Sequence, residues 1–304
     1  MKKVIVRLGN GLGNQLFTYA AAYSFSKKNN AKLYVDDTSG FYKRYKYELH
    51  NFNITAPIIE TKYKFIGAFG KIKRKVLIKF SNFNHQTKFL IEKRDQNKLS
   101  IYDIEQFNIH FNNKVYIEGY FQSEKYYKEY INNLLKEFSF KDEIIKQENN
   151  FINDIKKNNS VSIHLRQDKF MALDNHNERD KLNSEFLYNN IQIINKGIKY
   201  LDKFLDNPKY FIFSNDFRGL REMFPTNKFI FVDANLKKDP AYDLYLMSLC
   251  KHFILSPSTL HYWAAQLSCY PSKICLSPSN IKNKSGYYGF SNNKDIKADW
   301  WKDI

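Results

Sequence analysis

The sequence predicts an α/β protein built on parallel, doubly wound sheets, and two observations carry this prediction. In the second half of the chain, five short apolar strands alternate with helical segments. This alternation is typical of a parallel sheet covered by helices. At the start of the chain, a β-branched strand at residues 4–8 leads through a glycine-rich turn into a helix and then into a strand at 31–37. That order predicts a βαβ unit.

Length and charge limit the classes of protein. The chain has 304 residues, enough for one large or two ordinary domains, and 43% hydrophobic residues, enough for a packed interior. The net charge of +17 is compatible with nucleic acid, an acidic membrane surface or an anionic substrate. However, Lys, Asn and Ile are abundant along the whole chain, as in proteins from AT-rich bacterial genomes. The charge alone therefore selects no partner.

The cysteines and the start of the chain predict a cytoplasmic location. Three cysteines, an odd number, lack the spacing of metal ligands, which favours a reducing compartment. Polar residues between positions 7 and 15 interrupt the apolar run that a signal peptide requires. No run of about twenty apolar residues could span a membrane. We expect a cytoplasmic protein that contacts the inner membrane peripherally through its charge.

The first turn contains Gly9, Gly11 and Gly13 and is followed by Asn14 and Gln15. A glycine-rich turn at a helix start can hold a phosphate with backbone N–H groups. The glycine spacing does not match the dinucleotide fingerprint, and the Lys-Ser/Thr pair of a P-loop is missing. The alternative is that the glycines only permit a tight turn, which leaves the two amides as unusual polar groups at the helix start.

The rest of the first half gives fewer signals. Residues 41–99 are aromatic and basic with weak periodicity, and we expect short helices that cover a sheet there rather than a surface on which bases stack. A strand at 114–121 ends at Gln122 and Ser123, and a helix follows at 124–138. A charged helical link at 141–159 predicts a domain boundary near residue 156.

Polar side chains follow the strands of the second half. Arg166 follows the strand at 160–165, Asp216 follows the strand at 210–214, and Ser258 with Thr259 follows the strand at 252–256. The carboxyl ends of parallel strands share one edge, where ligands bind. Arg166 suits bidentate binding of a phosphate, and the two hydroxyl residues precede a helix whose N-terminus attracts anions.

Each of these residues also has an ordinary structural explanation. Serine, threonine and aspartate are common in caps and turns, and Arg166 could form a weak surface ion pair with Asp168. No Asp-x-Asp and no His/Cys cluster occurs in the sequence. A protein that binds a diphosphate at this edge stabilises its charge with a divalent cation or with fixed protein charges. We therefore expect fixed charges, with no metal site and no cofactor.

Six motifs resemble those of the α-1,2-fucosyltransferases, glycosyltransferase family 11. They are GLGNQLF at 11–17, YFQSEKYY at 120–127, HLR at 164–166, FSND at 213–216, DLYLMSLCKH at 243–252 and STLHYWAA at 258–265. The order of the motifs matches the family, and the resemblance extends from residue 4 to about residue 268.

The resemblance implies a GT-B-like fold, in which two Rossmann-like domains face a central cleft. Residues 1–155 would form the acceptor-side domain, 156–290 the nucleotide-sugar-binding domain and 291–304 a tail. The implied reaction is an inverting, metal-independent transfer of L-fucose from GDP-fucose to the 2-hydroxyl of a galactose. The acceptor would belong to a bacterial surface glycan such as lipopolysaccharide O-antigen, including lipid-linked forms, and nucleic acid would not be a partner.

The resemblance also implies roles for individual residues. The catalytic residues would be Arg166, Asp168 and Asn14. Donor binding would involve His164, Arg166, Ser214, Asp216, Ser258, Thr259, Gly11, Gly13 and Asn14. Acceptor binding would involve Gln15, Gln122 and Ser123.

The chain departs from the family pattern at three places. The usual His-x-Arg-Arg-x-Asp has Gln167 in place of the second Arg, with Asp168 one position early. Asn215 and Pro257 stand where the family commonly has Asp and Asn. These departures leave a related GDP-deoxysugar as an alternative donor. Asp168 is our candidate general base, with a salt bridge as the alternative.

A non-catalytic basic protein that binds nucleic acid or a lipid surface is the other alternative. The dispersed lysines and the lack of a helix-turn-helix or RNA-recognition motif argue against it.

Overall fold

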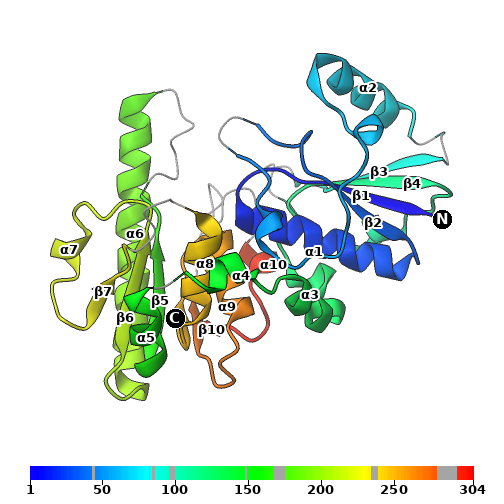
Figure 1. The fold of residues 1–304 in the computed structure, drawn as a ribbon. Helices are drawn as coiled ribbons and strands as arrows, with labels where there is room; N and C mark the ends of the chain where they lie inside the picture. Colours follow the sequence, from blue (N-terminus) through cyan, green and yellow to red (C-terminus); the bar gives the residue numbers. More distant parts are fainter. Residues whose placement is uncertain are drawn as a thin grey trace. The chain divides into compact units, whose positions relative to one another are not determined.

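The structure, a computed structural model, divides into two compact units (Figure 1). It describes residues 1–42, 45–81, 83, 86–95, 100–147, 149–167, 175–233, 239–278 and 293–304. Unit 1 comprises residues 1–141 and 283–298, and unit 2 comprises residues 142–282 and 299–304. The chain thus enters unit 2 before the domain limit expected at residue 155, and the expected tail contributes to both units. The roles assigned to the two domains stay predictions.

Unit 1 contains a four-stranded parallel sheet with the order β2-β1-β4-β3. The strands are β1 (Lys3–Arg7), β2 (Lys32–Asp36), β3 (Thr87–Ile91) and β4 (Lys114–Glu118). The predicted βαβ unit is confirmed, because β1 and β2 pair in parallel on either side of a helix in the chain. Strand β3 lies in the segment whose weak periodicity had predicted only short helices.

The helices of unit 1 lie on opposite faces of this sheet (Figure 1). Helix α1 (Leu12–Lys28) is buried along most of its length, while α2 (Gly67–Lys79) is largely exposed. Between the sheet and α2 lies a core of Ile5, Ile59, Phe65 and Tyr116. The segment expected to form one helix at 124–138 instead forms two short 3-10 helices, written η, and one α-helix. They are η4 (Glu124–Tyr126), η5 (Lys128–Tyr130) and α3 (Ile131–Glu137). The remaining elements are η1 (Leu49–Asn51), η2 (Thr61–Tyr63), η3 (Ile104–Asn108) and α10 (Asn293–Ile296).

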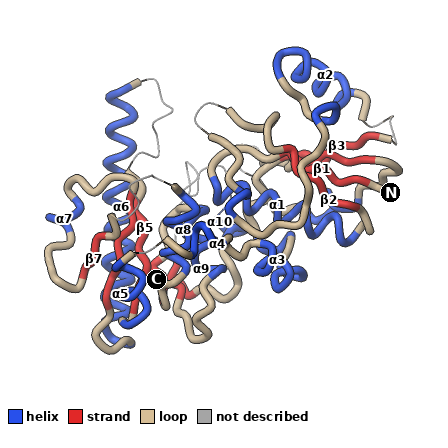
Figure 2. Tube along the Cα trace, viewed as in Figure 1, coloured by secondary structure: helices blue, strands red, loops and turns tan. Residues whose placement is uncertain are grey.

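Unit 2 contains a six-stranded parallel sheet with the order β10-β9-β8-β5-β6-β7. Figure 2 shows its strands in red. They are β5 (Ser160–Leu165), β6 (Lys209–Ser214), β7 (Phe229–Phe231), β8 (His252–Ile254), β9 (Cys275–Ser277) and β10 (Lys302–Asp303). The five predicted strands are confirmed. The strands β5 and β6 are buried on both faces, as central strands of a doubly wound sheet are.

Six helices in the described part of the chain belong to unit 2. They are α4 (Asp142–Ile145), α5 (Asn150–Lys157), α6 (His176–Phe204), α7 (Leu220–Met223), α8 (Pro240–Ser248) and α9 (Thr259–Leu267). Ile194, Ile198 and Leu201 of α6 share a core with Ile163 and Ile212 of the sheet. Asp239 caps α8, because its carboxylate accepts the Ala241 N–H at 2.9 Å.

Candidate active site

The strand orders bring the predicted residues to two positions. In unit 2, β6 and β7 extend the sheet on one side of β5, while β8, β9 and β10 extend it on the other. The carboxyl ends of β5 and β8 therefore form a topological switch point, where open α/β sheets bind ligands. Arg166 follows β5 and Ser258 follows β8. In unit 1, β1 lies between β2 and β4, so the turn after β1 and the segment after β4 are neighbours.

Two predicted residues of unit 1 meet at this point. Gln122 Nε2, after β4, donates a hydrogen bond to Asn14 Oδ1 in the first turn of α1. Thr18 Oγ1 donates to the carbonyls of Asn14 at 2.9 Å and Gly119 at 3.0 Å, which ties the same two segments together. Gly11 immediately precedes α1, and its carbonyl accepts the Asn14 N–H at 3.0 Å. The structure therefore places Gly11, Asn14 and Gln122 in one cluster.

Gln15 is fully buried beside this cluster. Its Nε2 donates to the carbonyls of Asn10 at 2.9 Å and Lys46 at 2.8 Å, and its Oε1 accepts the Glu48 N–H at 2.9 Å. The side chain therefore joins the turn after β1 to residues 46–48. Its acceptor-binding role stays a prediction.

The first two glycines of the turn differ in what their positions require. A Cβ on Gly9 would lie 2.6 Å from the carbonyl oxygen of Gly40, so this position needs glycine for close backbone packing. A Cβ on Gly11 would lie 3.6 Å from the Tyr45 ring, at ordinary contact distance, and the Gly11 φ is −73°. Neither backbone conformation nor the packing of the described residues requires glycine at position 11. Gly13 is buried in the first turn of α1.

A buried carboxylate holds the segment that carries Gln122. Glu92 follows β3, and its Oε2 and Oε1 accept the N–H groups of Tyr120 and Phe121, both at 2.7 Å. Phe121 has a φ of 49°, which is unusual for a residue other than glycine. Burial raises the pKa of Glu92, so its charge has a desolvation cost that these hydrogen bonds oppose. Sequence reasoning missed Glu92 because it missed β3.

Ser123 is the next residue after Gln122. Its hydroxyl is buried and has no hydrogen-bond partner among the described residues. Its acceptor-binding role stays a prediction.

In unit 2, Gln167 connects the segments after β5 and β6. Its backbone N–H donates to Asn215 Oδ1 at 3.0 Å, and its Nε2 donates to the Asp216 carbonyl at 2.6 Å. Two of the departures from the family pattern, Gln167 and Asn215, are thus hydrogen-bonded to each other. Ser214 Oγ also donates to the Asp216 carbonyl, at 2.5 Å. Arg166, immediately before this link, is partly buried.

The Asp216 carboxylate forms an exposed pair with Arg218. Arg218 Nε lies 2.8 Å from Asp216 Oδ2, and the Arg218 side chain is 89% exposed. Such exposed pairs contribute little to stability, and the donor-binding role of Asp216 stays a prediction. Asp168, our candidate general base, lies outside the described residues.

The start of α9 is held by a buried histidine. Ser258 Oγ accepts the His261 N–H at 3.3 Å, which makes Ser258 the N-cap, and Thr259 is the first residue of the helix. His261 Nδ1 accepts the Ser256 N–H at 3.5 Å, so Nε2 carries the proton and donates to Ser162 Oγ at 3.1 Å. Burial lowers the pKa of His261 well below its ordinary value, so the ring is neutral.

The ring of His164 lies 5.9 Å from that of His261. The predicted His164 and Ser258 therefore both lie against one residue, His261, to which the sequence analysis gave no role. Its motif position was the signal that could have found it.

The described residues also bear on metal binding and on the membrane. Among the described residues there is no group of three or more His, Cys, Asp or Glu that could hold a metal ion. Metal independence stays a prediction. No helix in the described part of the chain is long and apolar enough to cross a membrane.

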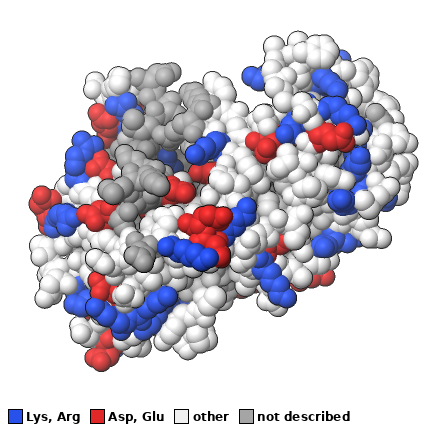
Figure 3. All heavy atoms as spheres, viewed as in Figure 1, with Lys and Arg blue, Asp and Glu red and all other residues white. Residues whose placement is uncertain are grey.

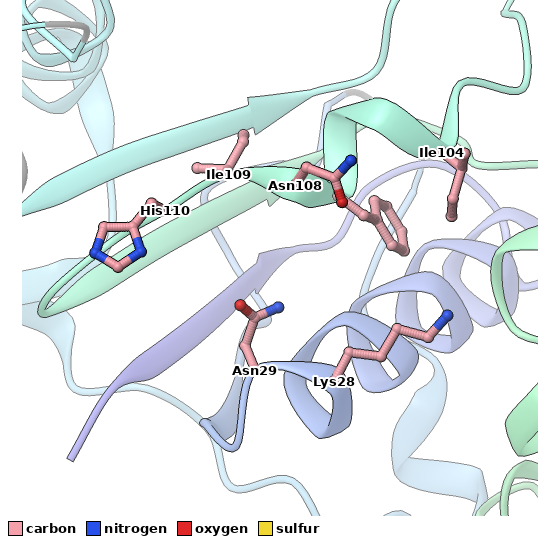
Figure 4. A pocket seen from close by; sticks show the side chains of 7 residues that line it. Lys28, Asn29, Ile104, Asn108, Ile109 and His110 are labelled. Carbon is pink, nitrogen blue, oxygen red and sulfur yellow. The ribbon is translucent and has the colours of Figure 1, made fainter.

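Unit 1 also has a pocket of about 390 Å³ at the far end of α1 (Figure 4). Lys28 and Asn29 line it from the C-terminal end of α1, and residues 104 and 107–110 line it from the opposite side. Asn14 lies in the first turn of the same helix, so this pocket is not part of the cluster around Asn14. None of the predicted site residues lines it.

Comparisons with known proteins agree with this arrangement. The structure resembles a fucosyltransferase NodZ from Bradyrhizobium, with a TM-score of 0.53, 16% identity and coverage of 92% of this chain and 96% of that chain. It also resembles a variant of Arabidopsis thaliana FUT1 in complex with GDP, with a TM-score of 0.55, 11% identity and coverage of 98% and 74%. These similarities confirm the predicted GT-B-like fold class. The central cleft stays a prediction.

Two curated relatives come from Escherichia coli. An alpha-1,2-colitosyltransferase is 27% identical over 92% of each chain. An O-antigen biosynthesis glycosyltransferase, WbnK, is 24% identical over 97% of this chain and 98% of its own.

The fold class is the GT-B-like one, and polar residues follow the strands of both sheets. The model of glycosyl transferase family 11 matches residues 3–302, and the chain belongs to that family.

Proposed function

We propose that the protein transfers L-fucose, or a closely related deoxysugar, from its GDP derivative to the 2-hydroxyl of a galactose. The reaction inverts the anomeric centre and needs no metal. The acceptor is a bacterial surface glycan of the O-antigen type, and the enzyme acts at the cytoplasmic face of the inner membrane.

The observation that carries this proposal is the placement of Arg166, Asp216 and Ser258 after three neighbouring strands, β5, β6 and β8. The Arg166 guanidinium and the N–H groups at the start of α9 bind the diphosphate and stabilise the charge that develops on it. Asp216 accepts hydrogen bonds from the guanine base. Gln167 and Ser214 hold the Asp216 backbone in place.

The acceptor binds from unit 1, through Asn14, Gln122 and Ser123. Asp168 remains our candidate for the base that removes the proton of the attacking hydroxyl. Because these assignments concern side chains in two units, they rest on the family resemblance as well as on the contacts within each unit.

The names of the relatives support a GDP-deoxysugar donor. One relative is a colitosyltransferase, and colitose is L-fucose without its 3-hydroxyl group. The structurally similar NodZ is an alpha-1,6-fucosyltransferase, and one of its crystals was soaked with GDP-fucose, which supports the same donor class. The donor is therefore GDP-fucose or GDP-colitose.

A donor panel tests this function. The purified protein is incubated with GDP-fucose, GDP-colitose, GDP-mannose or UDP-galactose, with and without a β-galactoside, in the presence of EDTA. We expect galactoside-dependent release of GDP from one of the first two donors, and an α-1,2 linkage by NMR. Turnover of UDP-galactose alone, or binding of random DNA without any affinity for GDP, would contradict the proposal.

A further inference from the structure

Helix α2 of unit 1 has an exposed apolar stripe. Phe69, Ile72, Val76 and Phe80 recur at i, i+3, i+7 and i+11 and are 81%, 60%, 49% and 54% exposed. At about 100° per residue, this spacing places them on one face of the helix. Phe83, just after the helix, is 86% exposed. Single exposed apolar residues are common, but a continuous stripe of large ones indicates an interaction surface.

The opposite face of α2 anchors the helix to unit 1. Leu77 packs against the core below the helix, and a Cβ on Gly70 would lie 2.4 Å from the backbone of Phe65. Arg74 Nε donates to both carboxylate oxygens of Glu118, at 2.8 and 3.0 Å. These contacts fix the rotation of the helix, so the stripe faces away from the core of unit 1.

Positive charge flanks the stripe. At about 100° per residue, Lys73 lies on one side of it and Lys75 and Lys79 lie on the other. Lys71 and Arg74 bring the helix to five basic residues, and it contains no acidic residue. Figure 3 shows blue cationic side chains next to white surface at the position that α2 occupies in Figure 1.

We propose that α2 docks unit 1 on a bilayer that contains anionic phospholipid. Phenyl and aliphatic side chains enter the boundary between headgroups and acyl chains, and the lysines contact the phosphates. The helix has 13 residues, too few to span a bilayer but enough to lie in its interface. The basic flanks select a negatively charged surface, which is why we infer a bilayer rather than a second copy of this basic chain.

Docking at α2 has a consequence for the acceptor, which rests on the proposed function. Glu118, the partner of Arg74, is the last residue of β4, and the segment with Gln122 follows it. Docking of α2 therefore brings the segment after β4, which contains Gln122, close to the membrane, where a lipid-linked glycan is located.

Vesicle sedimentation of the full-length protein tests the docking without any sugar donor. Vesicles of phosphatidylethanolamine with phosphatidylglycerol are compared with vesicles of phosphatidylcholine. One variant replaces Phe69, Ile72, Val76 and Phe80 with Ser, and a second replaces Lys71, Lys73, Lys75 and Lys79 with Gln. We expect the wild type to bind the anionic vesicles, and each variant to bind them at least about tenfold more weakly.

A matched control removes the same charge from another exposed helix. Lys181, Lys196, Lys199 and Lys203 of α6 are exposed, and their replacement by Gln should leave vesicle binding close to that of the wild type. Equal loss in this control, or no binding of the wild type to anionic vesicles, would overturn the proposal. So would a wild-type dimer that the serine variant dissociates, because the stripe would then bind a second copy.

Transfer to a soluble galactoside separates this proposal from the proposed function. Both α2 variants should retain the wild-type rate on that acceptor, while their vesicle binding falls. Absence of transfer in all samples would contradict the proposed function and leave the vesicle result unchanged.

Discussion

Gln122 Nε2 donates a hydrogen bond to Asn14 Oδ1, and this bond joins the segment after β4 to the first turn of α1. Because the Asn14 amide oxygen accepts this hydrogen bond, the Asn14 Nδ2 group points the other way and can donate to a ligand. An amide donor near a helix N-terminus suits the oxygen of a phosphate or a sugar.

Substitution of Asn14 by Asp tests this orientation. The carboxylate still accepts from Gln122, so we expect the fold to be retained, but the donor is replaced by a negative charge. Loss of one donor at a developing anion costs roughly 100- to 1000-fold in rate, and we expect a loss of this size in kcat. The control is Asn133→Asp on the exposed surface of α3. Wild-type turnover by Asn14→Asp would show that Nδ2 has no role.

Gly9 and Gly11 of the turn form a matched pair of substitutions. Gly9→Ala places a methyl group 2.6 Å from a carbonyl oxygen, and we expect it to lower the free energy of unfolding by about 2 kcal/mol or more. Gly11→Ala should change that free energy by less than about 1 kcal/mol but reduce GDP-sugar turnover, because we propose that the donor approaches the backbone there. Urea unfolding and rate measurements check both. If Gly11→Ala turns over normally, the glycine serves no ligand.

Glu92→Gln tests the support of the Gln122 segment. An amide has one acceptor oxygen, whereas the N–H groups of Tyr120 and Phe121 use both carboxylate oxygens. We expect a loss of about 1–3 kcal/mol in the free energy of unfolding, together with a raised KM for the acceptor in the folded variant. Glu105→Gln, on the surface of η3, should have neither effect. An unchanged KM would restrict Glu92 to a structural role.

Buried histidines predict loss of stability in acid. Burial lowers the pKa of His252 from 6.5 to about 4, and it lowers the pKa of His261 as well. Between pH 6.5 and about pH 4, the unfolded chain binds a proton at His252 that the folded chain does not. The free energy of unfolding is therefore highest above about pH 6.5 and falls as the pH drops towards 4. Urea unfolding at about pH 5 should give a free energy lower than at about pH 7, with about 1–2 kcal/mol of the difference from His252.

A non-titrating variant checks the source of this slope. In His252→Asn, the amide oxygen can replace Nδ1 as the acceptor for the Ile274 N–H, at 3.1 Å in the wild type, but cannot bind a proton. The variant should lose part of the slope, and the exposed His50→Asn should keep all of it. Equal slopes in all three proteins would contradict the assignment to His252.

The sequence predicted the parts of the structure that depend on local patterns. Apolar runs gave the strands β5 to β9, and the polar residues after them gave Arg166, Asp216 and Ser258 before the strand order was known. The missing parts depend on tertiary contacts. Strand β3 has only partial periodicity, so Glu92 had no predicted place. The contacts of the Gln15 amide with the backbone of residues 10, 46 and 48 could not be predicted either, because they join segments far apart in the sequence.

The central claim is that Arg166 and the start of α9 bind the donor diphosphate without a metal ion. Calorimetric titration of GDP in EDTA tests it most directly, with wild type, Arg166→Lys and, as control, Arg221→Lys, whose guanidinium forms an exposed pair with Asp233 at 3.5 Å. We expect wild type and the control to bind GDP equally, and Arg166→Lys to bind it roughly 10- to 100-fold more weakly. Binding that requires a divalent cation, or wild-type affinity in Arg166→Lys, would contradict the account.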